Sequence, residues 1–174
     1  MTDPQTPIEQ ALLSVTPDLY QLDSVTQTKE LTLQMVDQAS RSLDLLTADL
    51  EPALYDQPDF IEAFKRLALK SKVARIRILL QDNSLVRTQG HRLIELIQRL
   101  PSTVELRRPD RTFRDYPENF LLVDDCGYLH RRLIGRYQVT ACCNNRLQVS
   151  QFESLFIEAW EAGEPDRELA RLHL

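Results

Sequence analysis

Short apolar runs along the chain alternate with stretches in which apolar residues recur every three or four positions. The runs predict strands at about 42–49, 75–82, 103–107, 120–124 and 128–134, with a further short strand around 137–143. Helical spacing predicts helices that begin near residues 28, 59, 84 and 150. Strands that alternate with helices and then form a hairpin predict an α/β domain with a mixed β-sheet flanked by helices.

Local signals refine four of these elements. The run 75–82 becomes continuously apolar, which is typical of a strand covered on both faces. Asp59 with Glu62, and Ser150 with Glu153, have the spacing of capping boxes and predict helix starts. The helix that begins near residue 84 is expected to run unbroken to Leu100, where Pro101 ends it.

The first part of the chain differs from the rest. Residues 1–25 are polar and contain three prolines, so we expect a partly ordered lead-in, followed by one domain over residues 26–174. The chain has 174 residues, of which 43% are apolar and 27% charged. This composition is that of one ordinary globular domain that needs neither disulfides nor a metal to form its core.

Charge is distributed unevenly around the net value of −5. Residues 1–58 hold two basic and ten acidic side chains, residues 59–114 hold thirteen and six, and residues 115–174 hold six and ten. Only the middle third could therefore attract a polyanion. Its basic side chains could equally be a solvated surface, and an acidic chain is a poor general binder of nucleic acid.

Cysteines and the N-terminal sequence bear on location. The three cysteines are an odd number, and two of them, Cys142 and Cys143, are adjacent, which favours a reducing compartment. The N-terminal residues lack the basic and apolar blocks of a signal peptide, and no apolar run approaches the roughly 20 residues that span a bilayer. We therefore expect a cytoplasmic protein without a membrane anchor.

The segment from Pro117 to Asp124 has the outline of the motif H-x-K-x-x-x-x-D, with its first two residues replaced. The histidine position is occupied by Pro117, the lysine position by Asn119, and only Asp124 remains. Together with the strand that ends in Gln81-Asp82 and the last helix, this segment resembles a single phospholipase D-like domain over about residues 28–165. More narrowly, residues 160–174 resemble uncharacterised bacterial phospholipase D-like domains, some of which are joined to GNAT-type acetyltransferases.

The resemblance implies a fold but not the activity. In the phospholipase D superfamily the histidine attacks phosphorus and the lysine holds the phosphate oxygens, and neither proline nor asparagine can replace them. The resemblance therefore implies a pseudoenzyme that serves as an interaction or ligand-sensing module. It also suggests an acetyltransferase-like protein partner, and homodimerisation, because active members bring two copies of the motif together.

A degenerate ligand site is a second hypothesis. Its candidate residues are Asp124, Asn119, Arg131, Arg132 and His130. Successive strand residues point to opposite faces, so at most one of the two arginines should face the former pocket. There it could bind an anion or form a salt bridge to Asp124, Asp125 or Glu118. A phosphodiesterase with His130 as its nucleophile is a further alternative.

Nucleic-acid binding without catalysis is the remaining alternative. Its candidate residues form the densest basic run of the chain: Arg107, Arg108, Arg111 and Arg114. Phe113 and Tyr116 are interleaved with them, and arginines with aromatics can hold a single strand. The same aromatics could instead fix a loop to the sheet.

Metal and cofactor sites are not expected. His91, His130 and His173 are far apart in the sequence, and Cys126 with His130 supplies only two ligands. The glycine-rich nucleotide-binding motifs and the hydrolase motif G-x-S-x-G are absent. Cys126 is expected to be a turn residue and Cys142 a small core side chain.

Overall fold

One mixed β-sheet organises the molecule. The computed structural model describes residues 4–171, and within this range the sheet has eight strands in the order β1-β7-β6-β5-β2-β3-β4-β8. The strands are β1 (Tyr20–Leu22), β2 (Ser42–Thr47), β3 (Arg75–Leu80), β4 (Val104–Arg108), β5 (Asn119–Val123), β6 (Gly127–Arg131), β7 (Val139–Cys142) and β8 (Glu164–Pro165). β2, β3 and β4 are parallel to one another, and the other pairings are antiparallel. The expected mixed α/β fold is confirmed.

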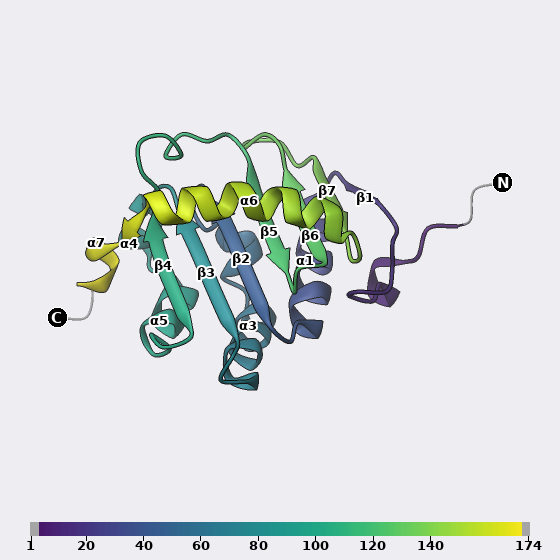
Figure 1. Cartoon of the computed structure of the whole chain (residues 1–174), viewed down its shortest axis with the longest axis horizontal. Coiled ribbons are helices and arrows are strands. Elements are labelled where there is room, and N and C mark those ends of the chain that lie inside the picture. The colour runs from purple at the N-terminus through teal and green to yellow at the C-terminus, as the bar shows by residue number, and fades with distance from the viewer. Residues whose placement is uncertain (1–3, 172–174) are drawn as a thin grey trace.

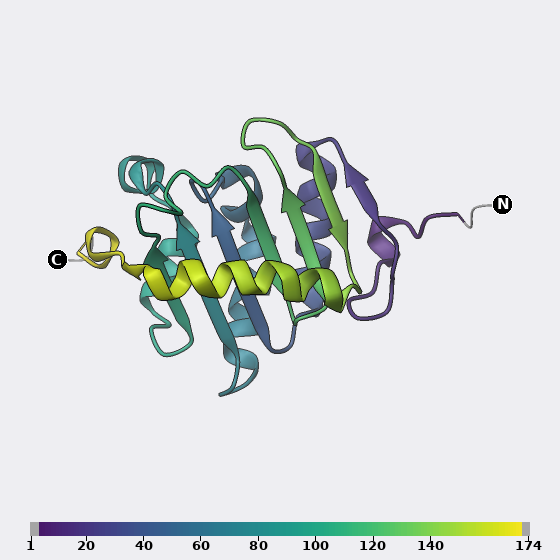
Figure 2. The same cartoon turned by 45° about the horizontal axis from the view of Figure 1, so that its top comes forward.

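Helices cover both faces of the sheet, as Figures 1 and 2 show. They are η1 (Ile8–Gln10), α1 (Val25–Gln38), α2 (Pro52–Tyr55), α3 (Pro58–Lys70), α4 (Ser84–Gln89), α5 (Arg92–Gln98), α6 (Arg146–Ala162) and α7 (Arg167–Ala170). α1, α3 and α5 lie on one face, while α6 alone runs across the other. The two chain ends lie at opposite sides of the molecule.

The two faces have different cores. The core under α1, α3 and α5 is mainly aliphatic, with fully buried Leu31, Leu43 and Ile76 among its members. The core under α6 is mainly aromatic and includes Phe120 and Phe156. Burial of these apolar side chains is the main source of stability for such a domain, at roughly 25 cal/mol for each Å² removed from water.

The segment expected to be a partly ordered lead-in contributes to the folded domain. Within residues 4–25, β1 pairs with β7, and Ala11 and Leu13 are buried in the aliphatic core. The side chains of Gln34 and Gln38 on α1 donate hydrogen bonds to the carbonyl of Ala11. Composition alone did not show that this polar segment has enough apolar residues to pack.

Gly90 divides the helix that was expected to run unbroken from about residue 84 to Leu100. It ends α4 with a φ of 74°, a left-handed conformation that glycine adopts without strain. His91 then caps α5, its imidazole Nδ1 accepting a hydrogen bond from the amide of Leu93 at 3.2 Å. The prediction of one continuous helix was therefore wrong.

Both predicted capping boxes were also wrong. α3 begins at Pro58, a residue that favours the first helical position, and no side chain caps it. α6 begins four residues before Ser150, at Arg146, because the side chain of Asn145 accepts a hydrogen bond from the amide of Gln148. In each case an earlier start signal preceded the predicted one.

Candidate functional site

The positions that the motif outline gives to its histidine and lysine lie where β5 begins, beside the carboxyl end of β2. Asn119 is directly opposite Arg131 on β6, and both face the aliphatic side of the sheet. Between these residues and α1 lies a cavity of about 30 Å³. Its polar lining consists of Thr28, Thr32, Thr47, Glu51, Tyr55, Asn119 and Arg131. Burial raises the pKa of Tyr55 far above its ordinary value, so its phenol stays neutral.

Arg131 is held in place by three neighbours. Its Nη1 atom lies 2.9 Å from a carboxylate oxygen of Glu51, and its Nε atom donates to the carbonyl of Arg136 at 2.9 Å. The guanidinium lies 4.3 Å above the ring of Tyr137. Only 12% of the Arg131 side chain is exposed. The salt-bridge alternative is thus the one observed, but with Glu51 in place of the three acidic residues considered.

Two buried polar atoms at this place have no hydrogen-bond partner among the described residues. They are the side-chain oxygen of Asn119 and the phenol oxygen of Tyr137. A cavity of 30 Å³ has room for about two water molecules, because one water needs roughly 10–15 Å³ of such space. A phosphodiester does not fit there without movement of the surrounding side chains.

Asp124 lies at the other end of β5 and does not belong to this site. Its carboxylate accepts hydrogen bonds from the amides of Ser40, Arg41 and Ser42 at 2.8–2.9 Å and from the Ser40 hydroxyl at 3.1 Å. Five residues of strand separate it from Asn119, about 16 Å. The side chain is 6% exposed and joins the β5–β6 turn to the start of β2. Its role is structural.

His130 and Arg132 also point away from the cavity. The ring of His130 lies on the α6 face, 4.7 Å from that of Phe152, and its Nε2 atom is 2.7 Å from a Glu118 oxygen. His130 and Asn119 are therefore on opposite faces of the sheet. Arg132 follows β6 and is exposed. The five candidate ligand residues thus form no single site.

The basic run is only partly available for a ligand. Arg107 pairs with Glu105 at 2.8 Å and lies over the ring of Trp160 at 4.5 Å, and Arg108 is half-buried. Arg111 and Arg114 are exposed.

The loop that carries this run is fixed to the sheet. The amide of Gln81 donates to the carbonyls of Phe113 and Tyr116 at 2.9 Å each, and Phe113 is buried. These contacts agree with the loop-fixing alternative for the two aromatics. Burial raises the pKa of the Tyr116 phenol above its ordinary value.

The three thiols and His91 do not line the cavity. Cys126, Cys142 and Cys143 are free and buried, and burial raises the pKa of each thiol, that of Cys143 to about 12. Such thiols are poor nucleophiles because the thiolate is the reactive form. His91 is buried, and His173 lies outside the described residues. Within residues 4–171, no three potential ligands cluster to hold a metal ion.

Glu51 is the site residue that sequence reasoning missed. It lies 80 positions before Arg131, so no local motif connects the two. One signal was available: Glu51 closely follows the carboxyl end of β2, the edge at which open α/β sheets place their functional groups.

Among the described residues, no helix is long and apolar enough to cross a membrane.

A comparison with protein families identifies the chain. A family described as a domain of unknown function, DUF7931, matches residues 24–172. The chain belongs to the DUF7931 family. A comparison of this DUF7931 chain with curated protein sequences finds no match.

Several solved structures share the fold. TrmBL2, an archaeal chromatin protein with a novel mode of DNA binding, superposes with a TM-score of 0.66 at 16% identity over 90% of the DUF7931 chain. The chain spans 56% of TrmBL2. The phospholipase D family member Nuc from Salmonella typhimurium gives 0.63 at 14% identity, over 87% of this chain and 99% of Nuc. NucT from Helicobacter pylori gives 0.60 at 12% identity, with coverages of 86% and 98%.

At these identities the likeness shows the fold, which the DUF7931 domain shares with the phospholipase D family members. The fold is retained in this chain while the positions expected to hold the reactive residues carry Pro117 and Asn119. What the domain does has to be argued from its own side chains.

Proposed function

We propose that this DUF7931 domain is a catalytically inactive phospholipase D-like module that works by binding a partner. The observation that carries the proposal is the small size of the cavity at the start of β5. Its volume is about 30 Å³, and its single arginine is bound to Glu51 and stacked on Tyr137. Phosphoryl transfer needs a nucleophile and positive groups placed around a bound phosphate. Pro117 and Asn119 provide neither.

The surroundings of His130 support inactivity as well. A replacement nucleophile would have to reach the same bound phosphate as Arg131. His130 instead lies on the other face of the sheet, between Glu118 and Phe152. Movement of this ring into the cavity would require β6 to turn over, which would expose its buried residues.

The test is hydrolysis of bis(p-nitrophenyl) phosphate by the purified chain, with Nuc from Salmonella typhimurium as the positive control. We expect no release of nitrophenol above that in buffer. Turnover that disappears in the His130→Ala variant would instead support a phosphodiesterase with a non-standard site. Turnover that survives this change but disappears in Arg131→Ala would locate the activity in the cavity. Either form of turnover contradicts the proposal.

A non-catalytic nucleic-acid reader is the second candidate, favoured by the fold shared with a DNA-binding chromatin protein. Arg111 and Arg114 are its exposed cations, and their loop is fixed to the sheet by Gln81. A gel-shift assay at low salt tests this candidate with single- and double-stranded DNA. Retardation that is lost in Arg111→Ala/Arg114→Ala would support nucleic-acid binding, whereas no retardation of either form would exclude it.

The narrower resemblance to bacterial domains joined to GNAT-type acetyltransferases suggests the kind of partner. We propose an acetyltransferase-like protein in a reducing cytoplasm, consistent with the three buried free thiols. Homodimerisation stays an alternative mode of assembly. Affinity purification from native cells followed by mass spectrometry tests both, since a stoichiometric heterologous partner and recovery of this chain alone are distinct results.

A further inference from the structure

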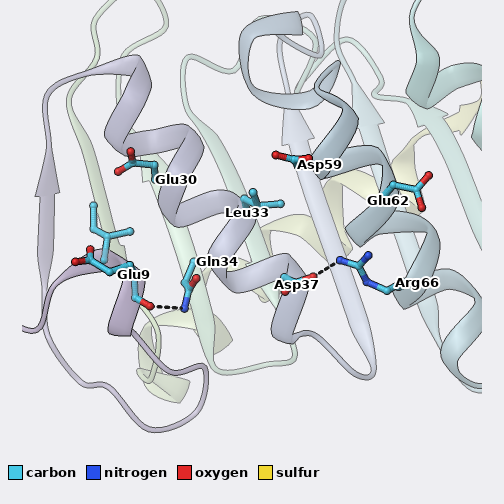
Figure 3. A pocket seen from close by; sticks show the side chains of 9 residues that line it. Glu9, Glu30, Leu33, Gln34, Asp37, Asp59, Glu62 and Arg66 are labelled. Carbon is cyan, nitrogen blue, oxygen red and sulfur yellow. Dashed lines mark hydrogen bonds and ion pairs between the residues drawn. The ribbon is translucent and has the colours of Figure 1, made fainter.

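A groove of about 660 Å³ lies on the helical surface, along the same helix α1 whose Thr28 and Thr32 line the small cavity. Its walls are η1, α1 and α3, as Figure 3 shows. The lining residues are Ile8, Glu9, Glu30, Leu33, Gln34, Asp37, Asp59, Glu62 and Arg66. The groove is far larger than the cavity of about 30 Å³ and is open to solvent.

The charge of the groove is almost entirely negative. Five carboxylates line it, and its one basic residue, Arg66, is already paired with Asp37. Among the described residues, the side chains of Glu9, Glu30, Asp59 and Glu62 form no ion pair or hydrogen bond. All four are exposed. Like charges at such spacing repel one another, and a cationic ligand would relieve that repulsion.

The floor of the groove is apolar. Leu33 projects from α1 toward α3, and Ile8 lies on η1. Both are half-buried and pack against the aliphatic core while keeping part of their surface in the groove. An apolar floor between acidic walls matches a ligand with an apolar stripe flanked by positive charges.

The walls are fixed before any ligand binds. The Gln34 amide donates to the carbonyls of Glu9 and Ala11, and Gln38 donates to Ala11 and accepts from the amide of Leu13. These bonds attach η1 to α1, while α1 packs along α3. A preformed groove has little ordering entropy to lose when a partner binds.

We infer that this groove docks a basic amphipathic helix of a partner protein, an inference that rests on the proposed binding function. A groove between two helices accommodates a helix whose apolar face covers Leu33 and Ile8 and whose lysines or arginines meet the four unpaired carboxylates. Nucleic acid and anionic membranes are repelled by this charge. Metal ions are a poor fit, because no ligand cluster exists in the described range. α1 is about 21 Å long, so a helix of roughly 14 residues matches the groove.

The test uses a fluorescent 14-residue helical peptide with lysines on one face and leucines on the other. We expect Glu30→Gln/Asp59→Asn/Glu62→Gln to weaken binding at least tenfold in fluorescence anisotropy. The matched control, Glu95→Gln/Glu158→Gln/Glu161→Gln, removes three exposed carboxylates without ion pairs from α5 and α6 and should leave binding unchanged. A peptide with serines in place of the leucines should also bind at least tenfold more weakly, and so should Leu33→Asn.

Several outcomes overturn the inference. Equal weakening in groove and control variants would show diffuse charge attraction, and full binding of the serine peptide would show that the floor is not used. Self-association of the chain, seen by light scattering and lost in the groove variant, would assign the groove to a second copy. Circular dichroism of each variant confirms folding. Failure of peptide binding leaves the absence of phosphodiesterase activity intact, so the groove and the proposed inactivity fail separately.

Discussion

The two ends of β5 differ in how the side chains of the motif outline are hydrogen-bonded. At the end of the strand, Asp124 keeps four hydrogen bonds that attach the β5–β6 turn to residues 40–42. At its beginning, Pro117 is exposed and Asn119 has a buried oxygen without a partner. Asp124 is thus integrated into the fold through its side chain, whereas the side-chain oxygen of Asn119 has no comparable contact among the described residues.

The largest expected effect is at the Asp124 end. Asp124→Asn replaces one of the carboxylate oxygens with an NH2 group that cannot accept from the amides it would meet. We expect a loss of about 3 kcal/mol in the free energy of unfolding, since hydrogen bonds to a charged group contribute about 1.5–3 kcal/mol and unpaired buried donors cost as much. Urea unfolding followed by circular dichroism measures the change.

The neighbouring Asp125→Asn provides the control. Asp125 also has a positive φ, of 57°, which asparagine tolerates, and its ion pairs with Arg41 and Arg146 are solvent-exposed. We expect a change below about 1 kcal/mol. Similar losses for the two variants would contradict the structural role assigned to Asp124 alone.

At the other end of β5, the Glu51–Arg131 pair should contribute less to the free energy of unfolding than Asp124 does. Arg131→Met leaves Glu51 three-quarters buried without its cation, so we expect a loss of about 2 kcal/mol. The double variant Glu51→Gln/Arg131→Met should be closer to the native protein than Arg131→Met alone, because both charges are then removed. A double-mutant cycle in urea measures the coupling. Additive effects would mean that the two side chains do not stabilise each other.

Much of the fold was predictable because its signals are local. The apolar runs that became β2, β3 and β5 were identified within a few residues, as was the β5–β6 hairpin. The helix break at Gly90 was less accessible, since an isolated glycine within a helical pattern can be tolerated and does not by itself mark a helix end. Tertiary hydrogen bonds from Gln34 and Gln38 secured residues 8–13, and no pattern within that segment indicates them.

The site was less predictable than the fold. Alternation within the strand expected at 128–134 could not decide between the two arginines, because β6 ends at Arg131 and Arg132 lies beyond it. The arginine that lines the cavity is Arg131. Its partner, Glu51, belongs to another strand end, so the pairing depends on the strand order β6-β5-β2, which periodicity does not specify. The groove carboxylates come from three separate elements, and the charge distribution indicated only the acidic excess of residues 1–58, which includes Glu9, Glu30 and Asp37 but not Asp59 and Glu62.

Acid should lower the free energy of unfolding through His91, which lies next to the cavity end of β5. Its Nε2 atom lies 2.9 Å from the carbonyl of Leu50, the residue before Glu51, and burial lowers the pKa of the imidazole below its ordinary 6.5. Below pH 6.5 the unfolded chain binds a proton that the folded chain refuses, so stability falls as the pH decreases from 6.5 toward the folded pKa. The slope from this group is at most about 1.4 kcal/mol per pH unit.

Comparison with His91→Asn isolates that contribution. Asparagine keeps an acceptor for the cap of α5 but does not titrate. We expect urea midpoints of the native protein to fall between pH 7.5 and 5.5 more than those of the variant. Parallel curves for the two proteins would show that carboxylates alone cause the acid dependence.

The smallest expected change in stability is at Asn119, at the beginning of β5. Asn119→Leu removes the buried side-chain oxygen that has no partner and places apolar atoms against Leu121 and Leu129, which share its face. Because an unpaired buried acceptor costs about 1–3 kcal/mol and Asn119 is only half-buried, we expect stabilisation of less than about 1 kcal/mol. Tyr137→Phe should behave alike. Destabilisation by both changes would mean that ordered water satisfies the two oxygens, so that this end of β5, like the Asp124 end, is stabilised by its polar groups.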